Sequence, residues 1–379
     1  MRRFFRLLFS LIKAVVVILF LGGITYYCID KIQKKNNLMD IEEYSPKSTL
    51  MVPQSLIKSA KYPFIDVHNH QFDMPVKNLS KLVAEMDSLN MAFMINLSGF
   101  RGLYLRKSLE NIQESAPTRF GLFLNIDFET IDEDDFAEKQ VALIDSAVSA
   151  GVMGLKVYKS LGLTDRDSNG NRIRVDDPRL APVWEACGAN GIPVLIHTGE
   201  PASFWNPKDK YNERWLELRQ KPNRYRDPKN NPSFEEVMAE QHAIFKNHPN
   251  TTFINAHLGW MGNDLDQLGK HLDQYPNVMT EIGAVLAELG RQPKRARQFF
   301  EDYQDRILFG KDSYKVSEYY TYFRVLETED EYFEYYRKRH AHWRMYGLGL
   351  PDSILQKVYY KNALRLFPNI DLTFFKIKI

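Results

Sequence analysis

The sequence has little of what marks several specialised protein classes. Its 379 residues include only two cysteines, Cys28 and Cys187, which form no C-x-x-C pair, so a disulfide framework is not expected. The formal net charge is only +2, and the basic residues are interspersed with acidic ones. Without a basic stripe, a role in binding nucleic acid has no support. Internal repeats and low-complexity runs are also absent from the sequence.

One long apolar run is present, at residues 14–29, and basic residues precede it at positions 2, 3, 6 and 13. A bilayer span needs about 20 residues, so this run alone is slightly short. Residues 4–12 can extend it if Lys13 snorkels towards the headgroups. Residues 1–30 are therefore predicted to be a membrane anchor, with a cleaved signal peptide as the alternative. Residues 31–60 are predicted to be a linker. The rest of the chain is expected outside the cytoplasm, anchored to the membrane, or secreted or periplasmic if the segment is cleaved.

From residue 61 to about 370, short apolar runs alternate with helical patterns, which favours βα units and a parallel sheet. Eight strands are predicted, at residues 62–67, 91–97, 119–126, 152–157, 192–197, 251–256, 277–282 and 306–310. Gly151 and Gly191 stand where helices end before strands four and five. Eight strands predict an α/β protein with a closed (β/α)₈ (TIM) barrel, and an open α/β sheet is the alternative.

Polar residues gather at the ends of these predicted strands. They are His68 and His70 after strand one, Asn96, Asn125 and Asp127 at strands two and three, Lys156 in strand four, His197 at the end of strand five, His257 after strand six, Glu281 late in strand seven and Asp312 after strand eight. The carboxyl ends of barrel strands form one mouth, where these groups are expected to converge. The other histidines, His242, His248, His271, His340 and His342, are expected to be solvated or packing residues.

Four of the residues at the mouth suit a metal ion. Side chains two apart on a strand point the same way, so His68 and His70 are expected to project together. With His197 and Asp312 they make a mixed nitrogen and oxygen set. Such a set suits one Zn²⁺, and Mn²⁺ or Fe²⁺ are also possible.

Four motifs together resemble a known family. They are H-N-H after strand one, V-L-I-H-T-G-E-P at strand five, T-F-I-N-A-H-L-G-W at strand six and R-I-L-F-G-K-D-S at strand eight. The sequence resembles the amidohydrolase-2 group of the amidohydrolase superfamily, which includes relatives of aminocarboxymuconate-semialdehyde decarboxylase. The resemblance runs from about Phe64 to a final helix at residues 354–367. It implies that His68, His70, His197 and Asp312 bind one Zn²⁺ and that His257 is a catalytic histidine beside it.

Two features depart from, or leave open, the family pattern. Strand eight reads G-K-D-S where many relatives have G-T-D or G-S-D, although the aspartate is kept. Lys156 lies in strand four, where relatives with two metals carry a carboxylated, bridging lysine. Three interpretations of Lys156 stay open: a bridging ligand, a cation that binds substrate, and a paired lysine of the barrel wall.

The predicted activity is metal-dependent hydrolysis of an amide, ester or lactone in a small molecule. Asp312 would accept a proton from water and return it to the leaving group, and His257 would stabilise developing charge. The same site would also suit non-hydrolytic decarboxylation of a carboxylic acid, which is the alternative enzyme. A non-catalytic, membrane-tethered binding barrel is the second alternative.

Two long insertions follow strands five and eight, at residues 200–235 and 313–350, and the second is rich in aromatic residues. Loops of this length are uncommon unless they are functional. They are expected either to form a substrate lid or to pack as helices over the barrel, and the second could also form an oligomer contact. Arg291, after strand seven, is predicted to reach a substrate carboxylate.

Overall fold

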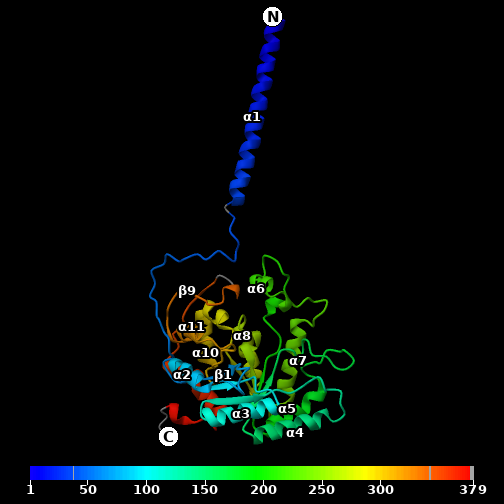
Figure 1. Cartoon of the computed structure of the whole chain (residues 1–379), viewed down its shortest axis with the longest axis vertical. Coiled ribbons are helices and arrows are strands. Elements are labelled where there is room, and N and C mark those ends of the chain that lie inside the picture. The colour runs from blue at the N-terminus through cyan, green and yellow to red at the C-terminus, as the bar shows by residue number, and fades with distance from the viewer. Residues whose placement is uncertain (37, 341–342, 376–379) are drawn as a thin grey trace. The chain divides into compact units, whose positions relative to one another are not determined.

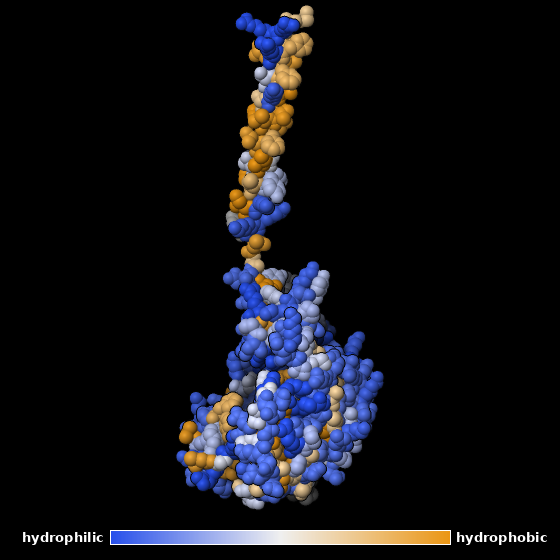
Figure 2. Space-filling model, turned by 90° about the vertical axis from the view of Figure 1, so that its right-hand side faces the viewer, coloured by the Kyte–Doolittle hydropathy of each residue, from blue (hydrophilic) through white to orange (hydrophobic). Residues whose placement is uncertain are grey.

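The computed structural model describes residues 1–36, 38–340 and 343–375, and it divides into two compact units, residues 1–50 and 51–379. In the first unit, α1 (Arg2–Asn36) has exposed apolar side chains along most of its length, seen as an orange surface in Figure 2. The helix is long and apolar enough to cross a membrane. It extends beyond residue 30 into the predicted linker, where Lys34 pairs with Asp30 one turn earlier.

The second unit is built on eight parallel strands that pair in the order of the sequence. They are β1 (Phe64–Asn69), β2 (Met91–Asn96), β3 (Phe120–Leu124), β4 (Gly154–Val157), β5 (Val194–Ile196), β6 (Phe253–Asn255), β7 (Val278–Glu281) and β8 (Ile307–Leu308). All eight predicted strands are present, most of them shorter than expected. Beyond β8 the chain returns to β1, where the Val67 amide donates to the Phe309 carbonyl at 3.0 Å. The fold is a nearly closed TIM barrel, as predicted.

Helices follow the strands and surround the barrel (Figure 1). They include α2 (Leu79–Leu89), α3 (Gly102–Ser115), α4 (Phe136–Ser149), α5 (Ala181–Ala189), α7 (Phe234–Asn247), α8 (Leu265–Gln274), α9 (Leu286–Arg291) and α10 (Pro293–Asp302). Gly151 and Gly191 follow the ends of α4 and α5 with φ of +100° and +65°. That left-handed conformation ends a helix without the penalty of a Cβ, which confirms the two predicted stops.

The predicted final helix is present but irregular. It consists of α12 (Asp352–Gln356), a π-helical turn at Lys357–Lys361 and α13 (Asn362–Leu366). The Asn362 side chain donates to the carbonyls of Gln304 and Ile307, both at 2.8 Å. This segment therefore holds the edge of β8, the strand that leads to Asp312.

The segments predicted to be insertions contact each other. The first contains α6 (Trp215–Gln220), and the second contains α11 (Val316–Glu327), β9 (Phe333–Glu334), a 3₁₀ turn at Lys338–His340 and β10 (Arg344–Met345). Helix α6 contacts this 3₁₀ turn. Tyr319 and Tyr322 on α11 are fully buried, and Tyr319 packs near Phe64 and Phe309 of the barrel. These aromatic side chains of α11 fill the core rather than face a substrate.

A buried ion pair joins the loop after β4 to helix α7. Glu240 is 1% exposed and accepts from Arg172 through both oxygens, at 2.7 and 2.9 Å, and from the Val175 amide at 3.1 Å. Glu240→Gln places an amide donor against the guanidinium, so we expect the free energy of unfolding to fall by about 3 kcal/mol. Glu236→Gln, on the same arginine but at an exposed position, should cost less than about 1 kcal/mol. Chemical denaturation measures both, and equal losses would contradict the prediction.

Candidate metal and active site

Strand β1 delivers two histidines to one carboxylate. His68 lies in β1 and His70 follows it, so the alternation of the strand turns both imidazoles the same way. Their Nε2 atoms lie 3.6 and 3.7 Å from Oδ1 of Asp312. Asn69, between them, turns away and donates to the Asp66 carboxylate and to the Tyr319 hydroxyl oxygen. The geometry is the one expected from the His-x-His spacing.

Asp312 is held at this point by an unusual backbone conformation. Its φ is +77°, and its amide donates to the His68 carbonyl at 2.6 Å. A non-glycine residue in the left-handed region is locally strained, so the surrounding structure must hold it in that conformation. The chain therefore turns sharply after β8 and presents the carboxylate to the two imidazoles of β1.

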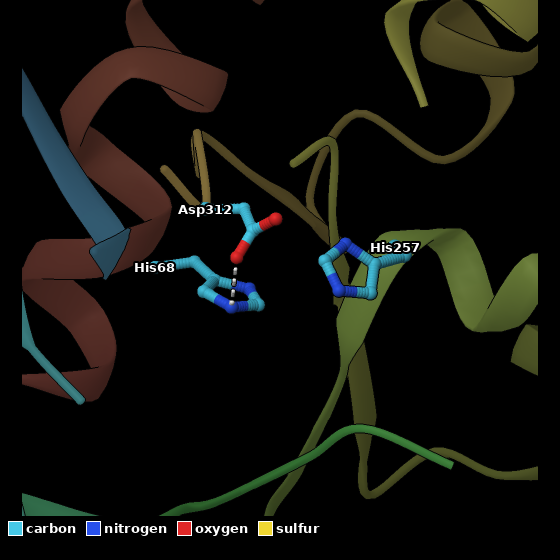
Figure 3. A group of neighbouring side chains, drawn as sticks. All are labelled: His68, His257 and Asp312. Atoms are coloured by element: carbon cyan, nitrogen blue, oxygen red, sulfur yellow. Dashed lines mark ion pairs between the residues drawn. The ribbon is translucent and has the colours of Figure 1, made fainter. Parts of the chain in front are cut away.

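His257 completes the group from the other side. His68, His257 and Asp312 each offer one atom that could bind a metal ion, and these three atoms lie within 4.8 Å of one another. Figure 3 shows His68 and Asp312 facing each other with His257 across from them. Residues 257–260 all have positive φ, so the chain coils back after β6 and returns His257 to the mouth. Its Nδ1 lies 2.7 Å from the Gly283 carbonyl and must carry the proton, which leaves Nε2 as an acceptor.

Glu281, the last residue of β7, organises these histidines. It is fully buried and accepts from His68 Nδ1 at 2.9 Å and from the His257 amide at 2.6 Å. The bond to a carboxylate places the His68 proton on Nδ1, so Nε2 keeps its lone pair towards Asp312. A Cβ on Gly310 would lie 2.2 Å from Glu281 Oε2, so glycine is required there for the carboxylate to reach its partners.

His197 lies next to His257, on the side of Trp260. Its ring centre lies 4.4 Å from that of His257 and 5.6 Å from that of Trp260. Its Nε2 is buried and, among the described residues, has no hydrogen-bond partner, as is also true of His68 Nε2. Unpartnered buried nitrogens are costly unless something else binds them, and a neutral imidazole is the form that binds metal ions.

Burial controls the protonation of this group. It lowers the pKa of His68 and His197 well below the usual value for histidine, lowers that of His70 to about 4, and also lowers that of His257. Burial raises the pKa of Asp312, but the neighbouring His68, His257 and His70 lower it by more, so the net shift is downward. Neutral imidazoles beside an ionised carboxylate are the donors that a divalent cation needs.

Lys156 is a buried amine beside the group. It lies in β4, is 1% exposed, and its Nζ has no hydrogen-bond partner in the described part of the chain. Burial lowers its pKa to about 7, although Asp312 and Glu281 favour the charged form. The ammonium position lies 5.5 Å from the centre of the Tyr158 ring. A lysine paired in the barrel wall, one of the three interpretations, has no support in these contacts.

Arg291 lies away from this group. Its guanidinium stacks on Trp343 at 3.8 Å and lies 3.3 Å from Glu213. It is not among the residues that line the cavities next to Asp312. Its predicted role towards a substrate carboxylate stays a prediction without support from this geometry.

Two cavities meet at Asp312. One, of about 80 Å³, is lined by His197, His257, Trp260 and the insertion residues Arg337 and His340. The other, of about 670 Å³, is lined by His70, Phe72, Lys77 and Tyr314. Sequence reasoning assigned no role to Arg337 or Glu281, and it treated His340 as an ordinary residue. His342 lies outside the described residues. The only sequence signal for Glu281 was its place at the end of a strand.

Histidines and carboxylates at the carboxyl ends of the strands of a TIM barrel define a class of barrel enzymes whose chemistry takes place at that mouth. The amidohydrolase family model matches residues 125–368, more than half of the chain. The chain therefore belongs to the amidohydrolase family, in the amidohydrolase-2 group. No curated protein matches it in sequence.

Solved structures share the fold at low sequence identity. An amidohydrolase II structure is 15% identical, with a TM-score of 0.50, and the match covers 81% of this chain and 100% of that one. An uncharacterised TIM-barrel protein from Bordetella bronchiseptica is 16% identical, with a TM-score of 0.49 and coverage of 81% and 98%. A dihydroxybenzoic acid decarboxylase from Polaromonas sp. JS666, solved with bound manganese, is 13% identical, with a TM-score of 0.49 and coverage of 83% and 100%.

Proposed function

We propose that the protein is a metal-dependent hydrolase that cleaves an amide, ester or lactone bond of a small molecule. The observation that carries this proposal is the convergence of His68 Nε2 and His70 Nε2 on Asp312 Oδ1, with the His68 atom buried and unpartnered. Two neutral imidazoles and an ionised carboxylate leave an excess of lone pairs at one point. Such an arrangement is unfavourable unless a cation occupies it.

The residues present fit one divalent ion, of which Zn²⁺ is the first choice. His68, His70, His197 and Asp312 would hold it, and Mn²⁺ or Fe²⁺ also accept this donor set. When bound, the ion would supply Lewis acidity and a more acidic water. Glu281 fixes the tautomer of His68, as outer partners of metal-binding histidines generally do.

The chain's own residues supply the proton transfers. Asp312, ionised and partly exposed to both cavities, accepts a proton from the attacking water and passes it to the leaving group. His257 has its Nδ1 proton committed to the Gly283 carbonyl, so its Nε2 is free to accept a hydrogen bond from that water. A neutral His257 therefore orients the nucleophile. The buried Lys156 would donate a hydrogen bond to a substrate oxygen, the substrate-binding interpretation of this residue.

The test is a hydrolysis screen of the full-length, metal-loaded chain in detergent. Lactones, esters, amides and aromatic carboxylic acids are supplied, and both hydrolysis products and CO₂ are measured. We expect hydrolysis in at least one of the first three classes, abolished by chelation and restored by Zn²⁺. CO₂ release from an acid without hydrolysis would replace the hydrolase by the decarboxylase. A chain that takes up no metal would favour the non-catalytic barrel.

We also propose that α1 remains on the mature protein as a membrane anchor, with the barrel outside the cytoplasm. The helix continues without a break through Tyr26, Tyr27 and Cys28 to Asn36, and no A-x-A site follows the apolar run. Purified from membranes of an expressing cell, the chain should have the mass of residues 1–379. A mature N-terminus after residue 28 would instead show a cleaved signal peptide.

A further inference from the structure

Positive charge gathers where the two insertions meet above the barrel mouth. The small cavity beside Asp312 is lined by arginines from both insertions, among them Arg214, Arg224 and Arg337. It is too small for a whole substrate but suits one functional group. The larger cavity on the other side of Asp312 leaves room for the remainder of a molecule.

The acidic residues around this cavity are already engaged by basic side chains. Glu200 binds Lys159 at 2.5 Å and Arg226 at 3.2 Å. Glu217 lies among Arg214, Arg224 and Arg339, and Arg214 also binds Glu288. The neighbouring His340 is neutral, because burial lowers its pKa. Glu200 and Glu217 are thus each shared between cations. Partly buried positive charge without a matching anion is costly.

Arg337 has no carboxylate within hydrogen-bond distance among the described residues. Its side chain is 15% exposed, and its guanidinium donates to Ser313 Oγ at 2.7 Å. The nearest carboxylate in the described part of the chain, Glu318, is 3.8 Å away and binds Lys311 at 2.6 Å. Within the described residues the guanidinium of Arg337 donates only to Ser313, which leaves donors for a further acceptor. Arg337 and Asp312 line the same small cavity.

We propose that Arg337 is a specificity-determining residue that binds an oxyanion on the substrate, a carboxylate or a phosphate group, in the small cavity beside Asp312. The inference rests on the proposed function, since it takes the group around Asp312 as the reaction centre. A guanidinium fork matches the paired oxygens of either anion. The anion would pair with Arg337, and the bond to be cleaved would lie towards the larger cavity.

The experiment measures ligand binding by calorimetry in the full-length chain, stripped of metal so that the probes bind protein groups alone. The probes are benzoate, phenyl phosphate and the neutral benzamide. We expect at least one anion to bind more tightly than benzamide, and Arg337→Met to weaken that anion about 10- to 100-fold. Preference for benzoate or for phenyl phosphate identifies which oxyanion the site takes.

Two further variants separate recognition from folding. Arg337→Lys keeps the charge without the fork and should retain part of the preference for the anion, whereas a purely structural arginine would give no such rescue. Arg295→Met removes an arginine that pairs with Asp266 on the exposed surface, and it should bind the anions as the wild type does. Equal binding of benzamide and the anions, or a preference that survives Arg337→Met, would overturn the inference.

These binding measurements and the hydrolysis screen together distinguish this inference from the proposed function. A chain that takes up no metal, yet prefers the anion through Arg337, would refute the metal-dependent hydrolase and keep the anion site. A chain that binds metal and hydrolyses a substrate, yet shows no such preference, would keep the hydrolase and refute the role of Arg337.

Discussion

The His68→Ala, His70→Ala double variant is expected to lose its bound metal and, with it, all measurable hydrolysis. The two imidazoles approach the same oxygen of Asp312, so removing both leaves at most His197 and Asp312 to hold an ion. Loss of an outer partner alone commonly costs about 10- to 100-fold in metal affinity, and loss of two direct ligands should cost far more. Metal analysis after dialysis should fall from about one ion per chain to a trace.

A second histidine pair gives a matched control. His242 on α7 and His271 on α8 have ring centres 4.0 Å apart, and burial lowers the pKa of both. They lie on helices outside the barrel mouth, so the His242→Ala, His271→Ala variant should keep its metal. Metal retained by the first variant, or lost equally by both, would contradict the proposed ligands.

The barrel was predictable because its strands are short apolar runs separated by helices that have clear stop signals. Gly151 and Gly191 marked two of those stops, and both have the left-handed conformation that such a stop requires. The strand ends were less accurate. The predicted strand at residues 306–310 is reduced to Ile307–Leu308, because the next amide, that of Phe309, donates to the Val358 carbonyl of the final helix. Hydrophobic pattern marks burial, and burial extends beyond the hydrogen-bonded residues.

The candidate site was predictable where strand geometry alone decides it. His68, His70 and Asp312 follow from the alternation of β1 and from the common mouth of barrel strands. The backbone of His257 could not be read in this way, since four consecutive left-handed residues have no local sequence signal beyond Gly259. The role of Glu281 depends on its contacts with two other strands, and no periodicity within β7 reveals them.

The insertions were the least predictable part of the chain. Their aromatic content left a substrate lid and helices packed over the barrel as alternatives, and Tyr319 and Tyr322 are buried in the core. The basic residues that face the mouth come from two segments more than a hundred positions apart, as the contact of α6 with the 3₁₀ turn at Lys338–His340 shows. Arg291 lies near a strand in the sequence, which predicts a place at the mouth, whereas Arg337 reaches the cavity only through tertiary packing.

Asp312→Asn is expected to lower kcat by about 10⁴-fold while leaving the fold intact. Asparagine has the shape of aspartate, but its amide cannot accept the proton of the attacking water. The loss of the negative charge also weakens metal binding, so kcat must be measured at saturating Zn²⁺. Among the described residues the side chain of Asp312 makes no hydrogen bond, and His68 and His70 approach it only to 3.6 and 3.7 Å. The metal-free variant should therefore unfold at a denaturant concentration no lower than that of the metal-free wild type.

The unfolding measurement gives this prediction its force. Replacing a carboxylate that stabilises the fold lowers the free energy of unfolding, whereas replacing one that acts only in catalysis lowers activity alone. Asp305→Asn is the control, because that half-exposed aspartate pairs with Lys357 and Arg365 away from the barrel mouth. It should leave kcat unchanged and alter stability by no more than about 1 kcal/mol. An Asp312→Asn variant that retains most of its activity at saturating Zn²⁺ would remove the proton acceptor from the mechanism. One that loses activity only in proportion to lost stability would make Asp312 a structural residue.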